Sequence, residues 1–230
     1  MATLAPYDSR VERNLIPEDQ ANKQGQIVFS EGGPFSRAEA SEIFGGLNET
    51  KDPAMQPEQV RRGGKTYVLK RRTAYFGNRG ACYGYGGILK RRAVEWGQGG
   101  MGRVVDRIRE RVEKHTGRTF SYCLVNYYPN GTTGLGFHAD DESDLDPEEP
   151  IVSVSFGASR DMVFKHKRKE MSDIKVALTP GSVVEMHPPL QSNWKHAIPP
   201  RTRVTTGRFN LTFRALKKNE CARDDDDDQK

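Results

Sequence analysis

The sequence has few cysteines and no long hydrophobic run, and each shortage excludes a class of protein. Only Cys82, Cys123 and Cys221 occur in 230 residues. Their odd number and wide spacing exclude a disulfide framework and a cysteine-based zinc site, and favour a reducing compartment. No stretch approaches the roughly 20 apolar residues of a membrane-spanning helix, and the first residues lack a signal-peptide pattern. We therefore expect an intracellular protein without a membrane segment.

Hydrophobic residues are also scarce, at 35%, whereas 29% of the residues are charged. The 36 basic and 31 acidic residues give a net charge of +5. Five of the acids form one run, Asp224–Asp228, so residues 1–223 hold 35 basic and 26 acidic residues and a charge of +9. This basic body favours a polyanionic partner.

The hydrophobic period changes from helical to strand-like near residue 119. Before that point, Ser36 and Glu39 have the spacing of a capping box, and a second amphipathic stretch ends at Gly117, where a C-cap glycine belongs. After it come seven predicted strands: Ser121–Tyr128, Ile151–Phe156, Met162–His166, Ile174–Leu178, Ser182–Met186, Trp194–Ile198 and Arg208–Arg214. So many short strands in about 100 residues predict a sandwich or barrel, with a jelly roll among the options.

The last strand alternates between two kinds of side chain. Arg208, Asn210, Thr212 and Arg214 share one face, and three apolar residues occupy the other. A solvated edge strand would show the same alternation. Arginines, however, suit the two-pronged capture of carboxylates or phosphates.

His138-Ala-Asp140 offers two metal ligands on one strand face, because residues i and i+2 point the same way. One more histidine would complete the set of two histidines and one carboxylate that leaves open positions on Fe(II). Three histidines follow, and we prefer His196, since His187 precedes Pro188-Pro189, where the chain turns away. His166 lies in a basic run, and we expect it to be exposed.

Further upstream, Asn126 and Tyr128 also share a strand face. Their amide and phenol groups can hydrogen-bond a dicarboxylate that the two arginines hold. Polar inward positions on successive strands are costly unless these groups bind something.

These motifs together resemble one family. Leu124–Gly131, Gly136–Glu142, Pro150–Ala158 and Arg208–Arg214 are similar to segments of AlkB-type Fe(II)/2-oxoglutarate dioxygenases, and the resemblance runs in order from about Tyr67 to Leu216. Ser155–Lys167 further resembles the AlkB homologues that repair alkylated double-stranded DNA. The implied fold is α+β, mainly β: a double-stranded β-helix (jelly roll) with two or more flanking N-terminal helices and a nucleotide-recognition lid.

On this basis we expect three parts of the chain. Residues 1–25 form a flexible arm, 26–217 the dioxygenase domain, and 218–230 an acidic disordered tail. Within the domain, 26–118 hold the helices and the lid, and 119–217 the catalytic jelly roll.

The resemblance implies that His138, Asp140 and His196 bind Fe(II) and thereby serve catalysis. It implies a 2-oxoglutarate pocket of Asn126, Tyr128, Arg208, Asn210 and Arg214. Arg208 with Tyr128 would hold the distal carboxylate, and the other three the carboxylate nearer the metal. The implied reaction uses O2, converts 2-oxoglutarate to succinate, and removes an N-methyl group as formaldehyde, while the protein supplies orientation and a dry site.

The substrate would be a flipped-out methylated base, such as 1-methyladenine or 3-methylcytosine. Tyr83 or Tyr85 would stack on it, and similarity favours Tyr85, although both tyrosines could instead pack on the core. Asp141 and Glu142 would favour a cationic lesion, although acids in a turn are often simply solvated. Phosphate contacts would come from the basic runs at Lys70, Arg71, Arg72, Lys167 and Arg168.

One segment departs from the double-strand-repair pattern. The expected aromatic hairpin finger corresponds to Arg61-Arg-Gly-Gly-Lys65, which holds no aromatic residue. Single-stranded DNA and RNA therefore stay open as substrates, and an insertion mode could use Arg62. We predict a DNA demethylase that acts in repair, as a monomer, in the nucleus of a eukaryote or otherwise in the cytoplasm. The alternatives are an RNA demethylase, a catalytically silent nucleic-acid-binding relative, and a protein hydroxylase, which the basic runs disfavour.

Overall fold

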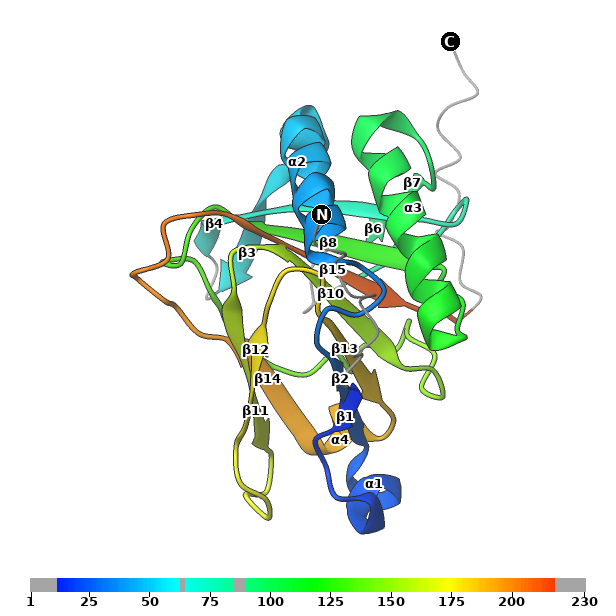
Figure 1. The fold of residues 1–230 in the computed structure, drawn as a ribbon, viewed down its shortest axis with the longest axis vertical. Helices are drawn as coiled ribbons and strands as arrows, with labels where there is room; N and C mark the ends of the chain where they lie inside the picture. The colour runs from blue at the N-terminus through cyan, green and yellow to red at the C-terminus, as the bar shows by residue number, and fades with distance from the viewer. Residues whose placement is uncertain (1–11, 63–64, 85–89, 218–230) are drawn as a thin grey trace, which may run out of the picture.

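A computed structural model describes residues 12–62, 65–84 and 90–217, and Figure 1 shows its fold. The helices in these residues are α1 (Glu18–Gln24), α2 (Arg37–Ala54), α3 (Gly99–Thr116) and α4 (Leu190–Asn193). The strands are β1 (Glu12–Asn14), β2 (Gln26–Ser30), β3 (Gln56–Arg62), β4 (Lys65–Gly77), β5 (Cys82–Tyr83), β6 (Arg91–Arg92), β7 (Val94–Glu95), β8 (Tyr122–Tyr128), β9 (Leu135–His138), β10 (Ile151–Gly157), β11 (Arg160–His166), β12 (Ile174–Leu178), β13 (Val183–His187), β14 (Trp194–Ile198) and β15 (Arg208–Arg214). None of the described helices is long and apolar enough to cross a membrane.

Two sheets form the centre of the fold. The larger sheet follows the order β1-β2-β13-β10-β15-β8-β4-β3, with β7 added in parallel to β4. The smaller sheet follows the order β12-β11-β14-β9, and β5 and β6 form a separate pair. Apart from β7, all of these pairings are antiparallel, as the predicted jelly roll requires.

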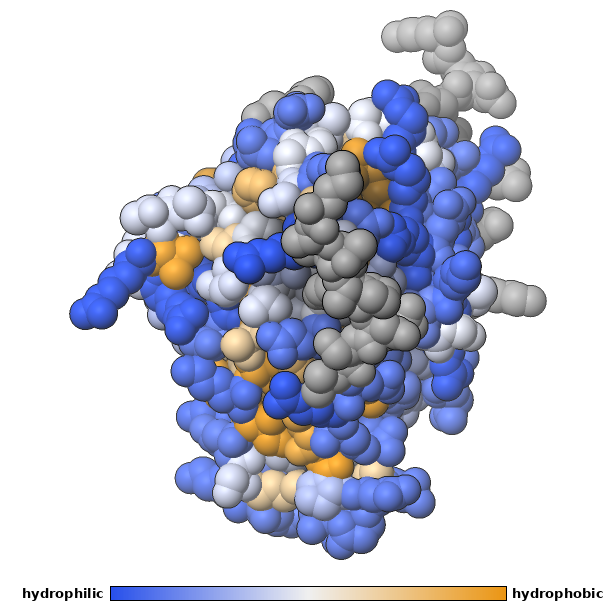
Figure 2. Space-filling model, in the orientation of Figure 1, coloured by the Kyte–Doolittle hydropathy of each residue, from blue (hydrophilic) through white to orange (hydrophobic). Residues whose placement is uncertain are grey.

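Helices α2 and α3 lie side by side across one face of the larger sheet (Figure 1). α2 begins with the predicted capping box, in which Ser36 and Glu39 exchange hydrogen bonds between side chain and backbone. α3 ends at Gly117, whose left-handed backbone (φ 68°) explains the glycine. On the side of the molecule seen in Figure 2, hydrophilic residues dominate the surface, and hydrophobic ones gather in a smaller area below these helices.

Strand β15 runs through the middle of the larger sheet, between β10 and β8. All seven of its residues are buried. Phe209, Leu211 and Phe213 belong to the apolar core that α2 and α3 cover. The polar residues of the alternation therefore face the other side, toward the smaller sheet. The alternative of a solvated edge strand therefore does not apply to β15.

Several predictions of local structure need correction. Residues 12–25 of the expected flexible arm are ordered, since β1 pairs with β2, α1 follows, and Ile16 is buried. His166 is buried rather than exposed, with Nε2 2.8 Å from Gln24 Oε1. Cys82 is disulfide-bonded, which differs from the expected reduced cysteines, while Cys123 is free and buried. The remaining domain boundaries stay predictions.

Candidate active site

Three potential metal ligands meet where β9 and β14 pair. His196 of β14 lies directly opposite His138 of β9, and Asp140 follows two residues after His138. One ligand atom from each of the three lies within 4.8 Å of the others. The two imidazole rings are 4.3 Å apart between centroids. Sequence-distant strands thus bring together a set of donors that suits Fe(II) with open positions.

The alternative histidine, His187, lies elsewhere. It ends β13, and its Nε2 is 3.2 Å from a carboxylate oxygen of Glu185. It does not belong to the group of ligand atoms around Asp140.

The carboxylate of Asp140 has one oxygen engaged and one available. Arg214 donates a hydrogen bond of 2.6 Å from Nη2 to Asp140 Oδ2. Asp140 Oδ1 is buried, accepts no hydrogen bond within the described residues, and lies 3.4 Å from His138 Nε2. An ionised oxygen of this kind, beside two imidazoles, fits a cation.

Electrostatics keep this group of side chains ready for a metal. Burial alone would raise the pKa of Asp140, but Arg214 and the two imidazoles outweigh it and hold the pKa well below its ordinary value. Burial lowers the pKa of His196 to about 4, against the opposing charge of Asp140, so its imidazole is neutral at pH 7. For His138, burial lowers the pKa, but the neighbouring carboxylate of Asp140 raises it above the ordinary value.

A pocket for an anion lies beside the metal ligands, lined in part by residues of β8 and β15 on one face of the larger sheet. The register pairs Arg208 with Tyr128 and Asn210 with Asn126. The guanidinium of Arg208 lies 5.4 Å from the ring centroid of Tyr128. Together with Arg214, these residues are the five that the sequence assigned to 2-oxoglutarate, and the fold brings them to one side of the sheet.

Several polar atoms of these five residues are buried without a hydrogen-bond partner among the described residues. They are Arg208 Nε and Nη1, Arg214 Nε and Asn126 Oδ1. Burial lowers the pKa of Arg208 to about 10, so it remains charged at neutral pH. Orphaned donors on a buried cation are costly unless a ligand satisfies them. The donor set fits a dicarboxylate such as 2-oxoglutarate.

Two serines of β10 complete the pocket, and sequence reasoning missed them. Ser155 Oγ accepts a 2.8 Å hydrogen bond from Arg208 Nη2, and Ser153 Oγ donates one of 2.9 Å to Asn210 Oδ1. Both lie in Ile151–Gly157, where they alternate with valines that face the helix-covered core. This alternation in the sequence could have predicted that the two serines face the pocket.

Of the two candidate stacking tyrosines, Tyr83 packs inside the protein. Its ring lies against Tyr122 and 5.1 Å from the guanidinium of Arg214, and its hydroxyl donates a 2.6 Å hydrogen bond to Glu142. Tyr83 is 1% exposed, so its surroundings agree with the alternative that it packs on the core and not with stacking on a base. Tyr85 lies outside the described residues.

The two acids after the metal ligands differ in their surroundings. Glu142 accepts the hydrogen bond from Tyr83, so it is held at the site. Asp141 is exposed, and its Oδ2 lies 3.6 Å from Lys167 Nζ. Only Glu142 is fixed in place by a direct hydrogen bond.

The first basic run does not form one phosphate-binding surface. Lys70 is exposed, but Arg71 is buried and lines the pocket beside the metal ligands, because alternate residues of β4 face inward. Arg72 is half-buried and donates a hydrogen bond to the Met55 carbonyl oxygen. The prediction of a phosphate contact is thus wrong for Arg71. The side chain of Arg62 lies outside the described residues.

The second basic run is also divided. Lys167 is exposed but donates a 2.8 Å hydrogen bond from Nζ to the Gln191 carbonyl oxygen. Arg168 is exposed, with Nε 3.0 Å from Glu170. Among the predicted phosphate contacts with described side chains, Lys70 and Arg168 extend most freely into solvent.

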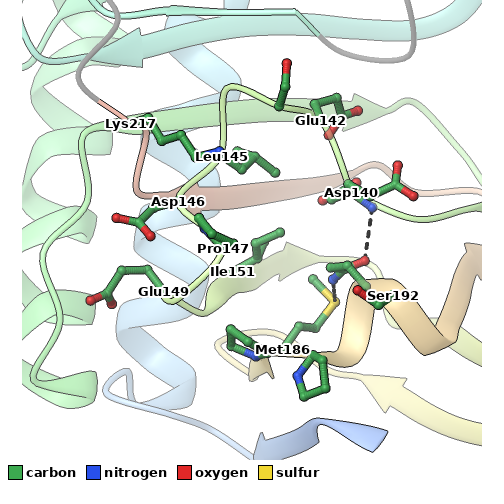
Figure 3. A pocket seen from close by; sticks show the side chains of 15 residues that line it. Asp140, Glu142, Leu145, Asp146, Pro147, Glu149, Ile151, Met186, Ser192 and Lys217 are labelled. Carbon is green, nitrogen blue, oxygen red and sulfur yellow. Dashed lines mark hydrogen bonds between the residues drawn. The ribbon is translucent and has the colours of Figure 1, made fainter.

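A second, acidic cavity of about 250 Å³ adjoins the metal ligands (Figure 3). Its walls are the segment from Asp140 to Glu149 on one side, and Met186 with α4 on the other. Asp140 and Met186 also line the pocket that Asn126, Asn210 and Arg214 line, so the two cavities share this wall. Sequence reasoning missed the contribution of α4 to the site.

Comparison with known proteins adds independent findings. The family model of the 2OG-Fe(II) oxygenase superfamily matches residues 32–214. DNA oxidative demethylase ALKBH2 from Mus musculus is 38% identical over 192 residues, which cover 79% of this chain and 77% of the relative. The Homo sapiens protein of the same name is 37% identical, covering 79% and 70%.

More distant similarities agree with these. Alpha-ketoglutarate-dependent dioxygenase alkB homolog 3 from Homo sapiens is 31% identical over 159 residues, covering 66% of this chain and 53% of the relative. A solved structure, "The structure of OsALKBH1", superposes with a TM-score of 0.55 at 18% identity, covering 82% of this chain and 97% of the other. This last likeness concerns the fold alone.

Proposed function

Since this chain belongs to the 2OG-Fe(II) oxygenase superfamily, among its AlkB-like members, we propose that it removes N-methyl groups from damaged bases in DNA. The predicted family and the mainly β jelly-roll fold are confirmed. As a member, the protein is an oxygenase that uses Fe(II), 2-oxoglutarate and O2. When bound, the iron and the cosubstrates supply the oxidation of the methyl group, which leaves as formaldehyde while 2-oxoglutarate becomes succinate.

We assign the iron to His138, Asp140 and His196. At pH 7 His196 is neutral and Asp140 ionised, so both are in the form that binds a cation. Arg214 holds one carboxylate oxygen of Asp140 and leaves the other for the metal. The chain thus orients its ligands before any ion arrives, which lowers the cost of binding.

We assign 2-oxoglutarate to the pocket of Asn126, Tyr128, Arg208, Asn210 and Arg214. The single observation that carries the proposal is the set of orphaned guanidinium N–H groups of Arg208 and Arg214, which lie buried on the same face of β15. Arg214 lines the pocket beside the metal ligands. Arg208 would hold the distal carboxylate, and Arg214 would steady the end nearer the metal. Ser155 keeps Arg208 in place.

DNA is the favoured partner because the two most similar relatives reported above carry the name DNA oxidative demethylase. The basic body of +9 agrees with a polyanion. Glu142 is held where an acid would favour a cationic methylated base, such as 1-methyladenine or 3-methylcytosine. A monomer inside the cell, nuclear in a eukaryote, completes the proposal.

Matched oligonucleotides test the proposal. The full chain is incubated with 1-methyladenine or 3-methylcytosine in single-stranded DNA, double-stranded DNA and RNA, with and without iron, and succinate and formaldehyde are measured. We expect iron-dependent release of both with DNA. A strong preference for RNA would contradict the repair role, and no release from any substrate would favour a catalytically silent binding protein.

A further inference from the structure

The backbone amide of Asp140 has an unusual partner for a metal ligand. Strand β9 ends at His138, so the N–H of Asp140 lies beyond the strand. It donates a 3.0 Å hydrogen bond to the side-chain oxygen Oε1 of Gln191, on α4 (Figure 3, dashed line). Without this contact the amide of a buried residue would lose its acceptor, which is costly.

The orientation of the Gln191 side chain follows from chemistry. The Asp140 N–H can only donate, so the atom that faces it must be the amide oxygen. The other end, Nε2, then points to the sulfur of Met186 at 3.5 Å. Gln191 is therefore held between a metal ligand and a residue that lines both cavities.

Lys167 fixes the backbone of Gln191. Its Nζ donates a 2.8 Å hydrogen bond to the Gln191 carbonyl oxygen and lies 3.6 Å from Asp141 Oδ2. One lysine thus connects the short helix α4 with the residue that follows the metal ligand. The side chain of Gln191 thus bonds the backbone of Asp140, and Lys167 lies near the carboxylate of the next residue, Asp141.

We propose that Gln191 is a positioning residue for the metal centre: it fixes the backbone of Asp140 so that the carboxylate meets the ion, and Lys167 holds Gln191 in place. Arg214 fixes only one carboxylate oxygen. Rotation of the Asp140 backbone would swing the other away from the two imidazoles. Ligand geometry must hold within about 0.5 Å, which depends on such supporting contacts. The inference rests on the proposed metal site.

Two variants of equal length separate positioning from packing. Gln191→Met removes the acceptor and keeps the size, whereas Gln191→Glu keeps an acceptor oxygen. The full chain is titrated with Mn(II) alone, without nucleic acid or 2-oxoglutarate, and free Mn(II) is followed by electron paramagnetic resonance. We expect Gln191→Met to weaken Mn(II) binding about 10- to 100-fold and Gln191→Glu to restore most of the affinity.

Asn193→Ala is the matched control. Asn193 lies on the same helix, and its amide donates to the Lys23 and Pro189 carbonyl oxygens, away from Asp140. We expect this variant to lower the melting temperature and leave Mn(II) affinity unchanged. Equal weakening in Asn193→Ala and Gln191→Met, or wild-type affinity in Gln191→Met, would overturn the proposal.

The support from Lys167 is tested on the same scale. We expect Lys167→Met to weaken Mn(II) binding less than Gln191→Met, and the double variant to bind no more weakly than Gln191→Met alone, because both act through one contact. Additive losses would overturn this role of Lys167. If the wild type binds no Mn(II), the metal site itself is wrong; if it binds Mn(II) but turns over no methylated DNA, only the proposed activity fails.

Discussion

Strand β15 has two faces that are equally buried and chemically opposite. Phe209, Leu211 and Phe213 are fully buried beneath α2 and α3, while Arg208 and Arg214, on the other face, are 1% and 2% exposed. On the apolar face each side chain finds its complement within the protein, including edge-on ring contacts such as Phe44 with Phe209.

The polar face lacks this complement. Three guanidinium nitrogens on it have no hydrogen-bond partner among the described residues. Burying such groups costs free energy. Burial alone therefore does not show that a residue belongs to the hydrophobic core. The apolar face of β15 stabilises the fold, whereas the polar face holds N–H groups whose hydrogen-bond acceptors a bound ligand would supply.

The metal end of the polar face gives the largest expected effect. His196→Ala should reduce demethylation of methylated DNA to background, since one of three metal ligands is lost, with little change in melting temperature. His187→Ala should keep most of the turnover, because His187 pairs with Glu185 outside the ligand group. The reverse result would move the third ligand to His187 and contradict the assignment.

A substitution on the apolar face of β15 should change the free energy of unfolding and leave ligand binding unchanged. Phe213→Ala removes a fully buried ring that packs against Phe120, at 5.7 Å between centroids. We expect a loss of about 3–5 kcal/mol in the free energy of unfolding, measured by urea titration. The dissociation constant for 2-oxoglutarate, measured where the variant is still folded, should stay near the wild-type value. A large change in this constant would mean that the two faces are not independent.

Arg208→Met, on the polar face, should have the opposite effect: weaker binding of 2-oxoglutarate without a loss of stability. We expect 2-oxoglutarate binding, followed by calorimetry, to weaken by about 2–5 kcal/mol, because a buried charge partner of the carboxylate is lost. The ligand-free protein should be as stable as the wild type or more so, since the variant removes a cation with unsatisfied donors. Strong destabilisation of the ligand-free variant would assign Arg208 to the fold rather than to the ligand.

The contrast between the polar and the apolar face of β15 could be predicted from the sequence, because it depends on the alternation of neighbouring residues. Alternation in Arg208–Arg214 separates the faces of β15, and the spacing of His138 and Asp140 gives two ligands on one side. The seven predicted strands correspond to β8 and β10–β15 within about two residues at each end, because their turn residues bound them clearly. The burial of Arg71 also follows from alternation, which a reading of the basic run as one surface overlooked.

Other features depend on contacts that no local pattern encodes. Residues 12–25 are ordered because β1 meets β2 and Ile16 enters the core, although their composition suits a loop. Gln191 reaches Asp140 across 51 positions of sequence through a helix of four residues. A single sequence without relatives offers no signal for such a pair.

The smallest expected effect concerns α2, one of the two helices that pack on the apolar face of β15. Hydrogen bonds from Arg111 and from the Ser36 N–H lower the pKa of Glu39 to about 2. Because the folded pKa lies below the unfolded value of 4.5, the stabilisation is complete above pH 4.5 and lost as the pH falls toward 2. Glu39 is half-exposed, so Glu39→Gln should cost at most about 1 kcal/mol near pH 7, and less at pH 3, in urea titrations. Glu42→Gln on the same helix is the control, since Glu42 makes no ion pair within the described residues. A Glu39→Gln effect independent of pH would assign the stabilisation to the cap geometry and not to the charge.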